Sequence, residues 1–132
     1  MTFEWGVEWK NESFDNLKAL LEAHGKGEKF EAASKAPVTT KVTKEGDTIV
    51  IERTNPKGTV RNVLALNGES EIDVPFMDGE KAKVTTSANP GQDLTIKAVD
   101  HDYVAVMSVE NGKLKEVFSS KGVTATRWSV RA

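Results

Sequence analysis

The chain has 132 residues, enough for one domain and too few for two independent cores, so a single domain spanning 1–132 is expected. Its 18 basic and 20 acidic side chains leave a net charge of -2, which argues against a nucleic-acid partner. The absence of cysteine excludes disulfides, thiol catalysis and cysteine-bound zinc. No apolar run reaches the length of a transmembrane helix, and the first residues lack a basic leader and an apolar stretch, so a cytoplasmic location is expected.

Apolar residues recur at every second position in short runs along most of the chain, which is typical of half-buried strands. The first predicted strand covers 3–9. Nine more are predicted at 36–42, 47–53, 59–66, 70–76, 80–86, 92–99, 102–109, 113–118 and 122–130. The separating segments are rich in Gly, Asn, Asp and Pro, as hairpin turns require. The pattern therefore predicts ten strands, almost all joined by hairpins.

The stretch from about 13 to 35 differs, because it is rich in helix formers and contains no β-branched residue. Two short helices are predicted, with Ser13 and Asp15 as candidate N-terminal caps and a break at the two glycines that follow His24. The expected apolar faces consist of Phe14, Leu17, Leu20 and Leu21 in the first helix and Phe30 in the second. A DNA-binding helix-turn-helix is disfavoured because this unit has little net charge and interrupts an all-β chain.

Ten antiparallel strands must protect their two edges, and closure into an up-and-down barrel does this directly. A barrel of this size is wider than its own side chains can fill, which predicts an internal cavity. The two helices between the first and second strands are expected to cover one mouth as a lid. The predicted fold is therefore an all-β, ten-stranded antiparallel barrel with a helix-turn-helix lid.

Counting in steps of two along each strand identifies the residues expected to face inward. They are Val38, Thr40, Val42, Ile49, Ile51, Val60, Asn62, Leu64, Ile72, Val74, Ala82, Val84, Leu94, Ile96, Tyr103, Ala105, Met107, Leu114 and Phe118. Most are apolar and would suit the body of a lipid. The alternative is that they pack an ordinary core.

Several stretches resemble the intracellular lipid-binding proteins, the family of the fatty-acid-binding proteins, in order and spacing over nearly the whole chain. They are "FEWGVEWKNESFDNLKAL", "SKAPV", "KEGDTIVI", "ESEIDVPFMDGEKAKV", "NGKLKE" and "KGVTATR". The ending "RWSVR" looks like the liver and ileal branch, as do "MDGEKAKV" and "TVRN". The resemblance implies a carrier of fatty acids or of bulkier ligands such as bile acids.

Two features depart from the family pattern. The segment between Trp9 and Phe14 is about two residues shorter than usual. Met107 stands where many members carry a second interior arginine, so a strict two-arginine clamp is not expected there.

The final strand carries Arg127 and Ser129 on one face, where an apolar face becomes cationic. Inside a cavity, the Arg127 guanidinium could hold a carboxylate or sulfonate through two parallel hydrogen bonds, with the Ser129 hydroxyl adding a third. A buried arginine needs a partner, and Glu116 falls on the same side of the preceding strand. Two alternatives therefore stay open: a structural pair between Arg127 and Glu116, or a shifted strand that points Arg127 into solvent.

Arg53 follows Ile49 and Ile51 in phase and could provide a second cation for the ligand. Because its strand ends near a turn, a solvated position at the rim is favoured. The predicted ligand-binding residues are Thr40, Ile49, Ile51, Arg53, Asn62, Leu64, Tyr103, Met107, Glu116, Arg127 and Ser129.

The sequence gives little support for metal binding or for catalysis. Asp100, His101 and Asp102 are consecutive and cannot all point at one ion from a strand. The two histidines lie at a predicted helix end and in a predicted turn, and no nucleophile motif accompanies them. An isomerase or hydrolase would need a perturbed acid or base in the cavity, for which only Glu116 qualifies. No metal, cofactor or enzymatic activity is expected.

The function predicted from these residues is a non-catalytic carrier, expected to be monomeric, for a fatty acid or another small hydrophobic anion. The helical lid is a candidate for transient contact with membranes. The alternative is a structural or stress-protective protein on the same barrel without a specific ligand. A mostly apolar interior with one or two cations favours the carrier.

Overall fold

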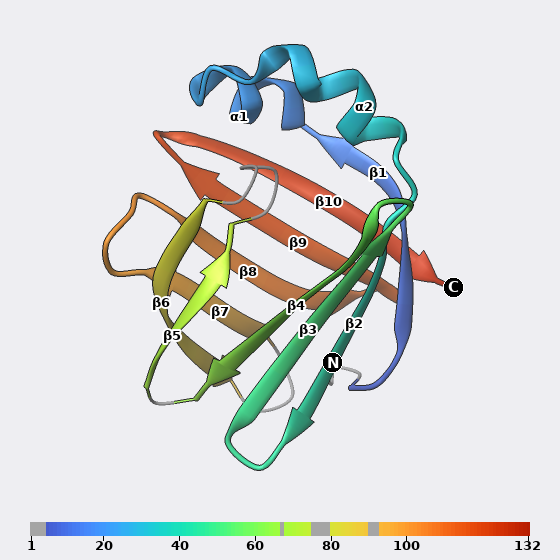
Figure 1. The fold of residues 1–132 in the computed structure, drawn as a ribbon. Coiled ribbons are helices and arrows are strands. Elements are labelled where there is room, and N and C mark those ends of the chain that lie inside the picture. Colours follow the sequence, from blue (N-terminus) through green and yellow to red (C-terminus); the bar gives the residue numbers. More distant parts are fainter. Residues whose placement is uncertain (1–4, 67, 75–79, 90–92) are drawn as a thin grey trace.

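The computed structural model describes residues 5–66, 68–74, 80–89 and 93–132, which form one sheet of ten strands and a small helical unit. The strands are β1 (Glu8–Asp15), β2 (Thr39–Glu45), β3 (Thr48–Asn55), β4 (Gly58–Ala65), β5 (Glu69–Asp73), β6 (Lys81–Asn89), β7 (Asp93–Ala98), β8 (Val104–Glu110), β9 (Lys113–Ser120) and β10 (Val123–Arg131). Their order in the sheet is β4-β3-β2-β1-β10-β9-β8-β7-β6-β5. The sheet curls into a nearly closed barrel with the helices over one end (Figure 1), which confirms the predicted fold.

Tight turns join neighbouring strands where the sequence carries residues that accept positive φ. The β8–β9 turn has Asn111 at φ 54° and Gly112 at φ 75°. The β9–β10 turn has Lys121 at φ 51° and Gly122 at φ 75°. Two central residues with positive φ match the twist of a hairpin, so these turns set the register that follows. Nine of the predicted strands overlap the observed strands β2 to β10, although 75, 76 and 92 of the predicted strands lie outside the described residues.

Between β4 and β5 the barrel is bridged by side chains rather than by a regular ladder. The Asn62 Oδ1 accepts a hydrogen bond from the Asp73 backbone N–H at 3.1 Å, and the Ser70 Oγ accepts one from the Ala65 N–H at 2.8 Å. These bonds occupy polar groups that a regular ladder would otherwise pair.

The first strand differs from its prediction. β1 begins at Glu8 rather than at residue 3 and runs through the polar segment to Asp15, although 3 and 4 lie outside the described residues. It pairs with β10 from Trp9 opposite Arg131 to Asp15 opposite Thr126, with a bulge between Asn11 and Ser13. The bulge interrupts the period of two and brings Phe14 opposite Arg127. The sequence pattern hid this strand because its second half has no regular alternation.

The lid therefore begins later than expected. It consists of α1 (Leu17–Ala23), the 3-10 turn η1 (Gly27–Lys29) and α2 (Phe30–Lys35). Ser13 and Asp15 are not helix caps and Phe14 is not a helical residue, because all three lie in β1. The N-cap is Asn16, at φ 62° and without a side-chain cap bond; its Nδ2 donates to the Thr124 carbonyl of β10 at 2.8 Å.

Helix α1 is attached to the barrel more firmly than α2. Leu17, Leu20 and Leu21 are buried, whereas no residue of α2 is buried and Phe30 is partly exposed. Leu20 belongs to the same apolar cluster as the inward side chains of the strands. No helix of the described residues is long and apolar enough to cross a membrane.

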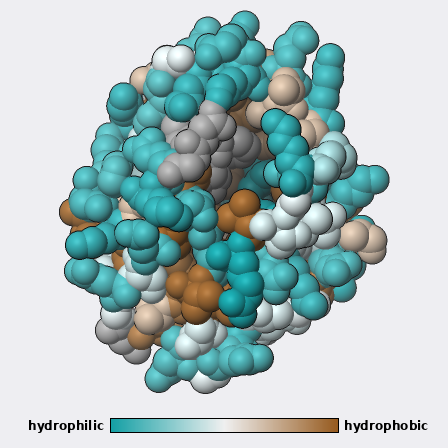
Figure 2. Space-filling view, in the orientation of Figure 1, coloured by the Kyte–Doolittle hydropathy of each residue, from teal (hydrophilic) through white to brown (hydrophobic). Residues whose placement is uncertain are grey.

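The inward residues were predicted well. Burial alternates strictly along β9 and nearly so along β8, as a sheet with one buried face requires. Of the predicted inward set, Val60 is 40 % exposed and Val38 and Val74 are only partly buried; the others are buried. The face of the molecule seen in Figure 2 is mostly hydrophilic, with a few hydrophobic side chains visible in its middle.

Candidate ligand-binding site

Glu116 occupies the centre of a charged cluster inside the barrel. Its Oε2 accepts a hydrogen bond from the Arg127 Nε at 2.9 Å, and its Oε1 lies 2.6 Å from an Arg53 guanidinium nitrogen. A longer contact of 3.4 Å joins Arg127 to Oε1. The side chains of Glu116 and Arg127 are 0 % and 3 % exposed, and that of Arg53 is 15 % exposed. The single carboxylate of Glu116 therefore forms ion pairs with two guanidinium groups.

The strand register explains how these three side chains meet. Glu116 lies directly opposite Arg127 in the β9–β10 ladder, so both point inward from neighbouring strands. Arg53 comes from β3, which β2, β1 and β10 separate from β9 in the sheet. Its contact with Glu116 thus crosses the interior of the barrel, and such a contact depends on the curvature of the sheet.

Burial and neighbouring charges together determine which groups of the cluster are ionised. Burial alone would raise the pKa of Glu116, but Arg127 and Arg53 hold it at about 2, so it is ionised at neutral pH. Burial lowers the pKa of Arg127, while Glu116 opposes that change. Burial also raises the pKa of Tyr103 well above its usual range and keeps that phenol neutral. Among the described residues the cluster therefore holds two positive charges against one negative charge.

Arg127 is enclosed on several sides. Its guanidinium carbon lies 5.9 Å from the centre of the Phe14 ring and 5.5 Å from that of Phe118. These distances are within the range of cation–π attraction. Arg127 does not point into solvent, and of the alternatives considered for it the structure contains the pair with Glu116. Ser129 is buried on the same strand; its contact with a ligand head group stays a prediction.

Arg53 is not a solvated rim residue, which corrects the expectation from its place near a turn. Besides its bond to Glu116, it donates from a terminal nitrogen to the Thr40 Oγ1 at 3.2 Å. Its Nε is buried and has no hydrogen-bond partner in the part of the chain that the structure describes. The turn begins three residues later, at Pro56, yet Arg53 shares the inward face of the sheet, because it lies opposite the buried Thr40 in the β2–β3 ladder.

The other predicted site residues form the surrounding wall. Ile49, Ile51, Leu64 and Met107 are buried and apolar, and Asn62 is buried with its Oδ1 bonded across the β4–β5 gap. Tyr103 is buried as well, and this burial is the main cause of its raised pKa. The structure thus brings all the predicted residues to the interior, while their contact with a ligand stays a prediction.

Two further buried polar groups were not predicted. The Trp9 Nε1 and the Thr86 Oγ1 have no hydrogen-bond partner within the described ranges, and both residues are almost fully buried. Trp9 is the last residue of the first predicted strand, from which the predicted inward set took no residue. Thr86 is in phase with Ala82 and Val84, so continued counting along that strand would have found it.

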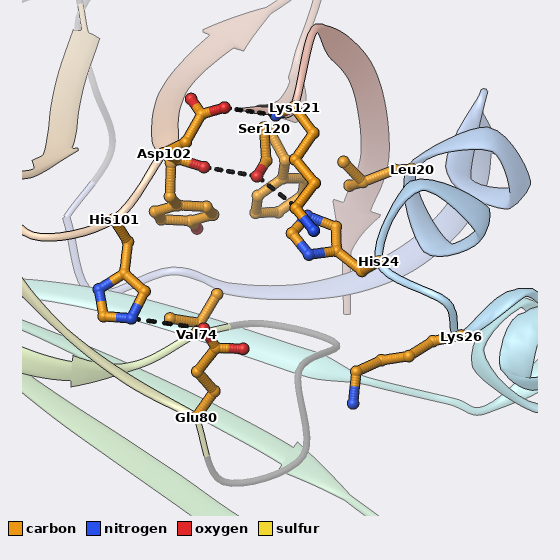
Figure 3. A pocket seen from close by; sticks show the side chains of 11 residues that line it. Leu20, His24, Lys26, Val74, Glu80, His101, Asp102, Ser120 and Lys121 are labelled. Atoms are coloured by element: carbon orange, nitrogen blue, oxygen red, sulfur yellow. Dashed lines mark hydrogen bonds and ion pairs between the residues drawn. The ribbon is translucent and has the colours of Figure 1, made fainter.

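A pocket of about 280 Å³ lies at the barrel mouth beneath α1, with Tyr103 and Phe118 among its lining residues (Figure 3). This volume is at the lower end of the range for small-molecule sites. Phe118 borders both this pocket and the Arg127 guanidinium, although none of the three charged residues of the cluster lines the pocket. The other lining residues are Leu20, His24, Lys26, Val74, Glu80, His101, Asp102, Ser120 and Lys121.

His24 and Ser120 link the lid to the barrel at this mouth. The His24 Nε2 lies 2.9 Å from the Ser120 Oγ, and the Ser120 hydroxyl donates to the backbone carbonyl of Asp102 (Figure 3). Since the hydroxyl has one proton, His24 acts as the donor in its bond to Ser120. Burial and the nearby Lys121 lower the pKa of His24, which favours the neutral form of its imidazole ring. The sequence placed Ser120 in a turn, although it is in phase with Glu116 and Phe118.

His101 lies across the mouth and has acidic neighbours. Its Nδ1 is 2.8 Å from an Asp100 carboxylate oxygen and its Nε2 is 3.4 Å from one of Glu80. The bond to Asp100 raises the pKa of His101. No group of three or more metal-ligating side chains occurs among the residues searched, which are those that the structure describes.

Neither a family model nor a curated protein matches the sequence. Solved structures do match along almost the whole chain. A Schistosoma mansoni fatty-acid-binding protein in complex with arachidonic acid has 21% identity and a TM-score of 0.84, with 97% of this chain and 96% of that chain covered. The REP1-NXSQ fatty acid transporter has 22% identity and a TM-score of 0.83, with 96% and 95% covered.

A zebrafish ileal bile-acid-binding protein complexed with cholic acid has 21% identity and a TM-score of 0.80, with 96% and 98% covered. This similarity is no greater than that to the two fatty-acid proteins, so the assignment to the liver and ileal branch stays a prediction. This chain shares the fold of the fatty-acid-binding proteins and of the ileal bile-acid-binding protein.

Proposed function

We propose that this protein is a non-catalytic carrier that holds a fatty acid or a related amphipathic lipid, such as a bile acid, inside its barrel. The observation that supports it most is the charged cluster, in which two arginines share one glutamate within an apolar interior. The fold neighbours include proteins with arachidonic acid and cholic acid bound, which agrees with this class of ligand.

The hydrogen bonds at the mouth support a non-catalytic role. A serine nucleophile must give its proton to the adjacent histidine. Here the Ser120 hydroxyl donates to a backbone carbonyl, so His24 cannot accept that proton in the observed arrangement. Of the two alternatives, the interior favours a carrier over a protective protein, because it is largely apolar and has a pocket at its mouth. We propose that the carrier acts as a monomer in the cytoplasm and that the lid makes transient contact with membranes.

Titration with an anilinonaphthalene probe tests the carrier. We expect binding in the micromolar range or tighter, with displacement by oleate or cholate, because apolar side chains line the interior. Ala105→Trp, on the inward face of β8, should weaken binding at least tenfold by filling the interior. Val106→Trp, the next residue and on the outward face, is the matched control and should bind normally. Failure of wild-type protein to bind the probe, oleate or cholate would contradict the proposal.

A further inference from the structure

We propose that Arg53, rather than Arg127, receives the acidic group of the ligand, and that Glu116 is a permanent internal counter-ion which leaves the cluster short of one negative charge. The site would therefore select lipids that carry a single negative charge. This inference rests on the proposed carrier function.

Arg127 is already paired with Glu116 through its Nε edge and is more deeply buried than Arg53. The Nε edge of its guanidinium, which could bind a carboxylate with two parallel bonds, is already directed at Glu116. The rings of Phe14 and Phe118 lie near the same guanidinium. A ligand carboxylate could bind Arg127 in the same manner only by displacing Glu116, which would then lie buried beside a second anion.

Arg53 offers a buried donor that no described residue satisfies. One terminal nitrogen bonds Glu116 at 2.6 Å, the other donates to Thr40 at 3.2 Å, and the buried Nε has no partner among the described residues. A buried N–H without a partner is costly, and a ligand oxygen would remove that cost. Arg53 is also the most exposed of the three charged side chains, so a ligand reaches it with the least rearrangement.

The charge count indicates the kind of head group. Among the described residues, two guanidinium groups and one carboxylate leave one positive charge in surroundings of low dielectric constant, where an uncompensated charge is strongly disfavoured. A monoanion neutralises the cluster, whereas an uncharged ester leaves it as it is. The selectivity therefore resides in the difference in affinity between an acid and its ester.

The experiment compares dodecanoate with methyl dodecanoate, because the two ligands share their chain and differ in charge. For the wild-type protein we expect the acid to bind roughly tenfold to a hundredfold more tightly, as one charge-assisted hydrogen bond provides. Arg53→Met should bring the ratio of the two affinities close to unity. Arg53→Lys should retain part of the preference, because the charge remains and the fork of donors is lost.

Arg127→Lys is the matched control for Arg53→Lys, because both variants keep the charge of the cluster and lose one fork of donors. The acid-to-ester ratio of Arg127→Lys should stay within about threefold of the wild-type value, because the net charge and the donors of Arg53 are unchanged. Thr40→Val is a second test, since loss of the Thr40 contact should lower the ratio by disturbing Arg53.

The possible outcomes are distinct. A ratio that falls more in Arg127→Lys than in Arg53→Lys would overturn the inference and assign the acidic group to Arg127. A wild-type ratio of unity, with both ligands bound, would overturn the charge selection and leave the carrier function intact. Absence of binding by both ligands would instead count against the proposed function itself.

Discussion

The charge balance of the interior depends on Glu116 more than on either arginine. Removing Arg127 leaves Glu116 paired with Arg53, whereas removing the charge of Glu116 takes away the counter-ion that both buried guanidinium groups share. Breaking a buried pair so that one charge is uncompensated is strongly destabilising, but a matched pair tolerates the low dielectric constant. The three residues are therefore unequal in their contributions to stability.

Glu116→Gln should lower the free energy of unfolding by about 3–5 kcal/mol, because it removes the negative charge that pairs with the two buried guanidinium groups. Arg127→Met should cost about 1–3 kcal/mol, the range for removing a hydrogen bond to a charged group. Arg61→Met, at an exposed position on β4, is the control and should change stability by less than about 0.5 kcal/mol. Urea unfolding measures all three. A greater loss in Arg127→Met than in Glu116→Gln would contradict this account of the cluster.

The two helices of the lid are held by different means. Helix α1 buries three leucines and is linked to the barrel through His24 and Ser120, whereas α2 buries no residue. Regions with few buried apolar contacts open at low free-energy cost. The lid is therefore expected to open at α2 first, with α1 remaining attached.

Ser120→Ala should weaken the attachment of α1. Loss of the hydroxyl removes the contact between His24 and the barrel and should speed amide hydrogen exchange in residues 17–23 several-fold. Exchange in residues 30–35 should already be fast and should change little. Ser119→Ala is the control, because the Ser119 hydroxyl lies on the outer side of β9 and bonds Thr124 instead. Equal exchange rates for α1 in the two variants would show that the His24–Ser120 contact does not retain the lid.

At the scale of the whole molecule, one ion pair joins parts of the barrel that the ladder keeps apart. β4 and β5 are linked by side-chain bonds such as that of Asn62, while the contact of Arg53 with Glu116 crosses the interior. The cluster therefore links β3 to β9 and β10 across the interior, in addition to the role in ligand binding proposed for it above.

Sequence patterns predicted most of this architecture, because a strand with one buried face alternates strictly and hairpin turns have recognisable residues. Period-two counting also placed Arg127 and Glu116 on facing inward positions, since both lie in regular strands. The counting failed at β1, where the bulge after Asn11 interrupts the alternation. It could not predict the reach of Arg53 to Glu116, because that contact depends on how the sheet closes rather than on any local pattern.

Acid unfolding tests the cluster in the intact molecule. The pKa of Glu116 falls from 4.5 to about 2 on folding, so the ionised carboxylate adds stability that is fully present above pH 4.5 and is lost as the pH falls through about 2. The contribution of this group is on the order of 3 kcal/mol. Urea unfolding followed by tryptophan fluorescence, from neutral pH down to about pH 2, should show stability falling across this window.

Comparing two destabilised variants separates the contribution of Glu116 to the pH dependence of stability from that of the other carboxylates. Glu116→Gln should show a shallower decline of stability between pH 4.5 and about 2, because the group that takes up the proton is absent. Leu94→Ala removes a buried side chain at a similar cost of about 2–5 kcal/mol but keeps Glu116, so its decline should run parallel to that of the wild-type protein. Parallel curves for all three proteins would mean that Glu116 gains no protection from the two arginines, and the charged cluster would then lose its role in stability.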